Sequence, residues 1–184
     1  MRKIIYAINL SIDGCCDHTA TTGGEDILEF FAGLIRGAGL LVYGRITYQL
    51  MVPYWPDIAK NKSGDTDEIE FARVFDAANK LVFSHSLDNV EDERSTLARK
   101  PLRDEILKLK QEEGNYILVG GVHLPSQLIM LGLVDEFIFV VHPVIAGEGR
   151  RLLDGISLQE KLSLKLVESK TLRSGCVVLH YAKQ

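Results

Sequence analysis

The chain has 184 residues, of which 46% are hydrophobic and 25% are charged, and its formal net charge at pH 7 is -4. These values are typical of one soluble domain with a substantial core. The chain has no excess or block of positive charge, which argues against nucleic acid or an anionic membrane as a partner.

The N-terminus predicts neither a signal peptide nor a membrane span, because residues 1–3 lead directly into a short apolar run over 4–8. The three cysteines, Cys15, Cys16 and Cys176, are odd in number and lack the spacing of metal ligands. We therefore expect free thiols, no metal site and a reducing compartment, for which the cytoplasm fits best.

Apolar runs and amphipathic segments alternate along the first half of the chain. Continuous apolar runs indicate buried strands, and apolar residues at helical spacing indicate the helices that cover them. In order, we expect a strand over 4–10, a polar loop over 16–24, a helix over 25–36, a strand over 40–43, a helix from 44 to about 51, a polar loop over 60–66, a helix or a pair of turns from 67, and a strand over 80–84.

The second half continues the alternation and then ends in strands. We expect a short edge strand over 95–97, a helix from 101, a strand over 116–119, a helix ending at 132, a strand over 134–145, and a hairpin of 162–172 with 176–181. This order predicts an α/β fold of one domain over 1–184, with three αβα layers around a mostly parallel twisted sheet and a C-terminal antiparallel hairpin.

The strand over 116–119 stops at two glycines, Gly120 and Gly121, and a helical pattern begins at Leu124. Adjacent glycines let the backbone approach a bulky ligand, and the free N–H groups of a helix start attract phosphate. We interpret this turn as a nucleotide pyrophosphate site. The alternative is that the glycines merely allow a sharp connection.

A second strand-to-helix junction combines Gly44, Arg45 and Thr47. Backbone donors, a fork-shaped cation and a hydroxyl are the groups that bind phosphate, although Arg45 as a solvated surface charge is the alternative. Asp13 and Ser84 also follow predicted strands. Because the carboxyl ends of parallel strands meet at one edge of a sheet, we expect these residues to converge on one crevice.

Several stretches together resemble a known family: Ser-Ile-Asp-Gly at 11–14, Gly-Arg-Ile-Thr-Tyr at 44–48, Val-Phe-Ser at 82–84, Val-Gly-Gly at 119–121, and Gly-Leu-Val-Asp-Glu at 132–136 leading to 142–150. The chain resembles the dihydrofolate reductase superfamily, and more closely the reductase domain of the bifunctional riboflavin-biosynthesis deaminase/reductase and its stand-alone relatives. The resemblance runs from the first predicted strand to the last.

The resemblance implies NADPH as the cofactor. It places Arg45, Ser84 and His85 near the adenosine 2′-phosphate, and Gly44 and Thr47 on phosphate. Along the pyrophosphate it places Gly120, Gly121, Val122, His123 and Leu124. In the family the bond between the two glycines is often cis.

The resemblance also implies hydride transfer to a small heterocyclic substrate that is pterin-like or pyrimidine-like. Our catalytic candidates are Asp13, which faces the ligand region in the riboflavin-pathway reductases, and Glu29, on the helix that carries the pterin-binding carboxylate in dihydrofolate reductases. The alternatives are a turn aspartate and a solvated helix residue. We expect His142 to be a structural partner.

Two other classes of function remain open. One is an NADP(H)-binding protein of the same fold with little or no catalytic activity, and the other is a sulfur-based enzyme that uses Cys15 and Cys16. We expect Trp55 to pack a loop, with a contact to a ring-shaped ligand as the alternative. We expect the apolar strand over 137–145 to be exposed and therefore to favour a homodimer.

Overall fold

The computed structural model describes residues 1–19 and 23–184, so part of the predicted polar loop over 16–24 lies outside the described residues. The strands are β1 (Ile4–Ser11), β2 (Leu40–Gly44), β3 (Lys80–Phe83), β4 (Ser95–Leu97), β5 (Ile117–Val119), β6 (Glu136–His142), β7 (Leu164–Thr171) and β8 (Val177–Lys183). The helices are α1 (Glu25–Gly37), α2 (Arg45–Met51), α3 (Tyr54–Asn61), α4 (Thr66–Ala77), α5 (Leu102–Gln111) and α6 (His123–Met130).

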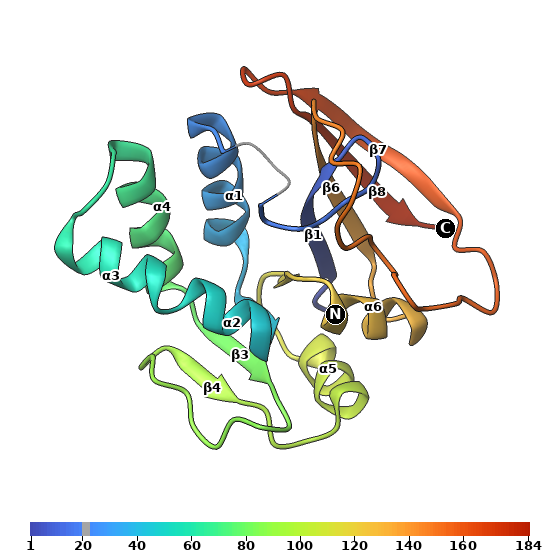
Figure 1. Ribbon diagram of the computed structural model, residues 1–184. Helices are drawn as coiled ribbons and strands as arrows, with labels where there is room; N and C mark the ends of the chain where they lie inside the picture. Colours follow the sequence, from blue (N-terminus) through green and yellow to red (C-terminus); the bar gives the residue numbers. More distant parts are fainter. Residues whose placement is uncertain (20–22) are drawn as a thin grey trace.

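The strands form one eight-stranded sheet in the order β4-β3-β2-β5-β1-β6-β8-β7 (Figure 1). The strands from β4 to β6 in this order pair in parallel, whereas β8 is antiparallel to both β6 and β7. The predicted fold class is therefore confirmed, including the C-terminal antiparallel hairpin. The carboxyl ends of the parallel strands, which include β1, β2, β3, β5 and β6, meet at one edge of the sheet, where ligands bind in such folds.

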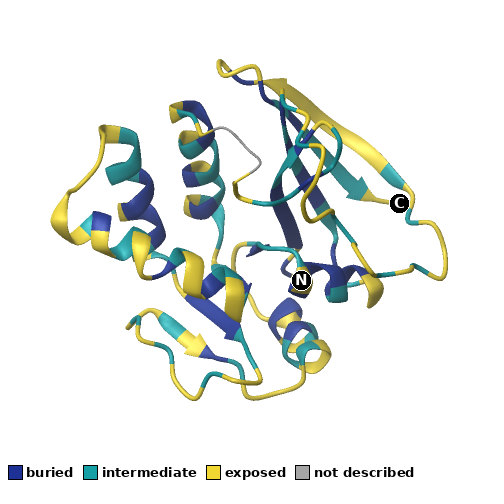
Figure 2. Ribbon diagram, viewed as in Figure 1, coloured by how far each residue is buried: buried dark blue, intermediate teal, exposed yellow. Residues whose placement is uncertain are grey.

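Two apolar clusters form the core, one on each face of the sheet. Helices α1, α2 and α4 contribute Ile35, Tyr48 and Phe75 to one cluster. Helices α5 and α6 contribute Ile106 and Leu128 to the other. Figure 2 shows the buried residues concentrated on the central strands and on the helix faces turned towards them. Nearly continuous apolar strands such as β1 are what a sheet covered on both faces requires.

No helix was predicted for the segment between α2 and α4. It forms helix α3, in which the Trp55 ring packs 4.4 Å from the Phe71 ring of α4, centroid to centroid. The packing role expected for Trp55 is confirmed. Helix α4 begins at Thr66 because the Asp65 carboxylate accepts the backbone N–H groups of Asp67 and Glu68.

Strand β6 corrects the reason given for a homodimer. The strand lies between β1 and β8, ends at His142 rather than at 145, and buries Phe137 and Val140. A strand paired on both sides offers no edge to a second chain, so an exposed β6 cannot support an interface. The exposed outer strand of this half of the sheet is β7.

No helix among the described residues combines the length and the apolarity needed to cross a membrane.

Candidate functional site

The turn between β5 and α6 packs directly against the start of α2. A Cβ atom added to Gly120 would lie 2.8 Å from the Tyr43 ring, and one added to Gly121 would collide with Oγ1 of Thr47. Gly121 also has a φ of +88°, which side chains rarely adopt. A side chain at either position would collide with the protein itself, so both residues must be glycine. This supports the interpretation of the turn as a sharp, tightly packed connection.

The bond between Gly120 and Gly121 is trans, as are all peptide bonds among the described residues, which corrects the cis bond that the resemblance implies. Tyr6 of β1 holds this turn from the other side. Its hydroxyl donates a 2.8 Å hydrogen bond to the Gly121 carbonyl, and burial raises its pKa well above the usual value, so the hydroxyl stays protonated.

Tyr6 was not among the predicted site residues. The signal was present in the sequence, because a tyrosine inside an otherwise aliphatic buried strand needs a partner for its hydroxyl. The residue lies in the core, with its ring packed edge-on against Phe137.

Helices α2 and α6 start beside one another on neighbouring strands. A Cβ atom at Gly44 would make an ordinary 3.5 Å contact with Leu124. Neither helix has a side-chain hydrogen bond at its N-cap, which is Gly44 for α2 and Val122 for α6. The first N–H groups of a helix have no intrahelical partner, so these two starts offer backbone donors to a ligand. Leu124 is buried, so its side chain belongs to the core.

The other predicted cofactor residues lie at the surface around these helix starts. Arg45 is exposed, and its guanidinium donates a 3.0 Å hydrogen bond to Gln49 one turn along α2. Ser84 follows β3, and its hydroxyl accepts the N–H groups of Ser86 and Leu87, which shapes the turn after this strand. His85 is exposed in that turn, and His123 is exposed at the start of α6.

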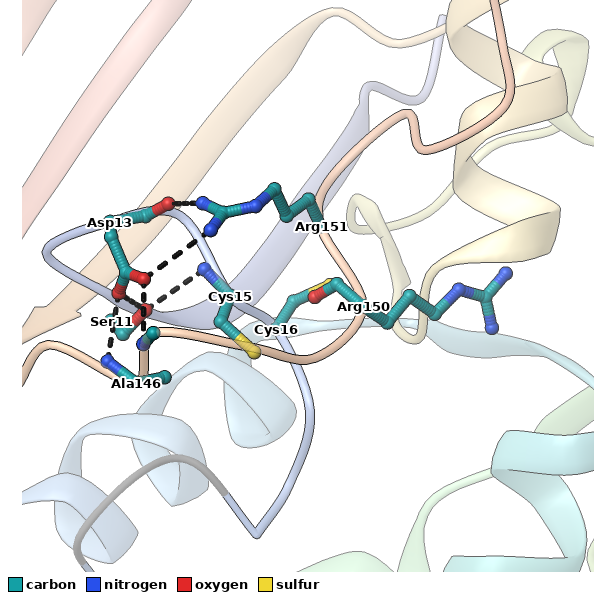
Figure 3. A network of polar contacts seen from close by, with 8 residues as sticks. Ser11, Asp13, Cys15, Cys16, Ala146, Arg150 and Arg151 are labelled. Carbon is teal, nitrogen blue, oxygen red and sulfur yellow. Dashed lines mark hydrogen bonds and ion pairs between the residues drawn. The ribbon is translucent and has the colours of Figure 1, made fainter.

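Asp13 joins the loops that follow β1 and β6 (Figure 3). Its carboxylate accepts the Ser11 hydroxyl at 2.6 Å and the backbone N–H groups of Ala146 and Gly147 at 2.9 and 3.0 Å, and it pairs with Arg151. The Ser11 hydroxyl, followed by these N–H groups, holds the pKa of the carboxyl far below its usual range. The group is therefore a carboxylate at neutral pH and serves as the anchor of both loops.

Backbone contacts extend the connection between these loops. The N–H of Ile12 donates to the Val144 carbonyl and the N–H of Cys16 donates to the Arg150 carbonyl, each at 2.8 Å. Cys15 is buried, with its sulfur against Gly149. Burial, followed by the neighbouring Cys15, raises the pKa of the Cys16 thiol, which is the opposite of what a reactive cysteine of a sulfur-based enzyme requires.

Glu29 stands apart from the residues gathered at the strand ends. Its side chain is 71% exposed, and it lies 3.9 Å from the guanidinium of Arg173 in the turn between β7 and β8. His142 is buried, and its Nε2 atom lies 3.0 Å from the Asn9 side-chain oxygen, as a structural role would require. No cluster of potential metal ligands occurs among the described residues.

Substitution of Gly121 by Ala tests whether the close contact sets the turn. We expect Gly121→Ala to lower the free energy of unfolding by at least about 1–2 kcal/mol, because of the left-handed φ and the collision with Thr47. Gly44→Ala is the matched control, since Gly44 has an ordinary φ of -81° and space for a methyl group. Chemical denaturation measures both, and equal losses would contradict the packing argument.

Substitution of Asp13 tests its anchoring role through pH. We expect Asp13→Asn to lower the melting temperature at pH 7. Because the pKa of the Asp13 carboxyl is lower in the folded than in the unfolded protein, its charged form stabilises the fold above the unfolded pKa of about 3.9. This contribution is lost as the pH falls further, so the difference in melting temperature between the variant and the wild type should shrink below about pH 4. Asp88→Asn, at an exposed loop position, is the control. A deficit that stays constant down to acid pH would refute the anchor.

Comparison with known proteins places these features in a family. Residues 2–178 match the model of the RibD C-terminal domain. The chain is 34% identical over 184 residues to the uncharacterized protein YyaP of Bacillus subtilis, covering 98% of this chain and 94% of the relative.

Two solved structures share the fold. One is a diaminohydroxyphosphoribosylaminopyrimidine deaminase/5-amino-6-(5-phosphoribosylamino)uracil reductase of Thermotoga maritima, with a TM-score of 0.70 at 16% identity over 100% of this chain and 57% of that one. The other is a dihydrofolate reductase of Enterococcus faecalis complexed with NADP(H), with a TM-score of 0.62 at 14% identity over 99% of this chain and 96% of that one. On the strength of the match over 2–178, the chain belongs to the RibD C-terminal domain family.

Proposed function

We propose that this protein is a reductase that uses NADPH to reduce a small heterocyclic substrate, either pyrimidine-like or pterin-like. The observation that carries the proposal is the contact between two uncapped helix starts, at Gly44 and Val122, with exposed Arg45 beside them. Membership of the RibD C-terminal domain family supports it, as does the likeness of the fold to a uracil reductase and to a dihydrofolate reductase that binds NADP(H).

The residues present fit the phosphate groups of this cofactor. The backbone N–H groups at the starts of α2 and α6 suit the pyrophosphate, because helix starts concentrate both donors and partial positive charge. Arg45, with Ser84 and His85 after the neighbouring strand β3, suits the adenosine 2′-phosphate. When bound, the cofactor supplies the hydride.

On the substrate side, we propose that Asp13 positions the reacting molecule by fixing the loops after β1 and β6. Its carboxylate is already bonded to both loops and holds its charge, so it does not donate a proton at neutral pH. We propose that water delivers the proton that completes the reduction. The catalytic assignment of Asp13 and Glu29 remains a prediction from the sequence.

One observation favours the second candidate, an NADP(H)-binding protein with little catalysis. Both predicted catalytic carboxylates already have partners within the protein, Asp13 in the loops and Glu29 with Arg173. Fluorescence titration with NADPH and NADH, followed by a cofactor-oxidation assay with a panel of pyrimidines and pterins, separates the candidates. Binding without turnover would favour the binding protein, and absence of NADPH binding would reject both.

The role of Arg45 predicts a difference between the two nicotinamide cofactors. Because NADH lacks the 2′-phosphate, we expect Arg45→Ala to weaken NADPH binding about tenfold and to leave NADH binding almost unchanged. Arg103→Ala, at an exposed position of α5, is the charge-matched control and should change neither. Titration of both cofactors against both variants measures this, and equal losses of NADPH and NADH with Arg45→Ala would refute the assignment.

A further inference from the structure

Two adjacent arginines in the loop after β6, Arg150 and Arg151, point in different directions (Figure 3). Arg151 is bound within the protein, because it pairs with Cys15 in an antiparallel bridge and its guanidinium donates to the Asp13 carbonyl. The guanidinium of Arg150 extends away from Asp13 and has no hydrogen bond or ion pair with any described residue. The loop therefore uses one arginine for its own structure and leaves the other exposed.

Backbone contacts fix the position from which the Arg150 side chain starts. Its carbonyl accepts the N–H of Cys16 at 2.8 Å and lies 3.2 Å from the Cys16 sulfur. Cys16 belongs to the loop after β1, which Asp13 holds against the loop after β6. Because the backbone is already ordered, a ligand that binds Arg150 has to order only its side chain.

The positive charge of Arg150 acts on the turn after β5. Burial, followed by Cys16, raises the pKa of the Tyr6 hydroxyl, and the charge of Arg150 opposes part of this rise. That hydroxyl donates its hydrogen bond to the Gly121 carbonyl, in the turn that leads into α6. Since the effect of a charge falls with distance and is screened by solvent, the Arg150 guanidinium lies near this turn.

The turn after β5 has no cation of its own. Residues 120–122 are uncharged, so the turn and the start of α6 offer a pyrophosphate only backbone N–H donors. Arg45 follows β2 and is proposed to bind the 2′-phosphate together with the turn after β3. A pyrophosphate carries two negative charges, and the fork of a guanidinium matches a pair of phosphate oxygens. The exposed guanidinium nearest this turn supplies the charge that the turn lacks.

We propose that Arg150 reaches across the crevice and binds the pyrophosphate of the nicotinamide cofactor, opposite the backbone donors at the start of α6. This inference rests on the proposed function. It makes the loop after β6 part of the cofactor site, although its backbone belongs to the half of the crevice that Asp13 builds. The pyrophosphate and the 2′-phosphate are then bound by different arginines, Arg150 and Arg45.

Three ligands separate the roles of these two arginines. NADPH and NADH share the pyrophosphate, whereas adenosine 2′-monophosphate has the 2′-phosphate without a pyrophosphate. We expect Arg150→Gln to weaken the binding of NADPH and NADH about tenfold each and to leave adenosine 2′-monophosphate unchanged. Arg45→Ala should instead weaken NADPH and adenosine 2′-monophosphate and spare NADH. Titration calorimetry of the full chain measures all three affinities.

Arg94→Gln is the matched control, because Arg94 is exposed and precedes β4, at the amino edge of the parallel strands. It should change none of the three affinities. Thermal unfolding checks that each variant is folded, and Arg150→Gln should keep the wild-type melting temperature because the Arg150 side chain makes no hydrogen bond or ion pair with a described residue.

The outcomes separate this inference from the proposed function. A wild type that does not bind NADPH would reject both. Wild-type binding that Arg150→Gln does not weaken would reject the inference alone, and so would a loss confined to NADPH or an equal loss with Arg94→Gln. Unchanged affinity for both cofactors with slower turnover would assign Arg150 to the substrate instead, which also overturns the inference.

Discussion

The approach of the Gly121 backbone to Thr47 is the constraint on which the candidate site depends. No side chain fits between the turn after β5 and the start of α2, and Tyr6 fixes the Gly121 carbonyl from β1. The turn after β5 is thereby joined to the helix start that follows β2 and to Tyr6 within β1. This contact brings the starts of α2 and α6 together, and it explains why two adjacent glycines are needed whether or not a ligand is bound.

The two halves of the crevice are built by different kinds of interaction. Backbone packing builds the half at β2 and β5, where the uncapped helix starts leave donors open to an anion. Charge-assisted hydrogen bonds build the half at β1 and β6, where the Asp13 carboxylate accepts N–H groups from the other loop. The first half is suited to bind phosphate, whereas in the second half the Asp13 carboxylate is already hydrogen-bonded to the protein.

The sequence predicts those features that a short stretch of residues determines. Apolar runs, alternation and helical spacing located the strands and the helices α1, α2, α5 and α6. The segment of α4 was left as a helix or a pair of turns, and α3, which contains Pro56, was not predicted. Sheet order has no local signal, so the apolar run over 134–145 could not reveal that β6 lies between β1 and β8. Asp13 shows the same limit, since its partners Ala146 and Gly147 lie more than a hundred residues away along the chain.

The sheet order also separates the two halves of the crevice. The strands that lead to Arg45 and Ser84 are β2 and β3, on the side of the sheet that ends at β4. Strands β1 and β6, which carry the Asp13 loops, lie on the other side of β5. Because β5 lies between the two halves, its turn at Gly121 contacts both of them, through Thr47 on one side and Tyr6 on the other.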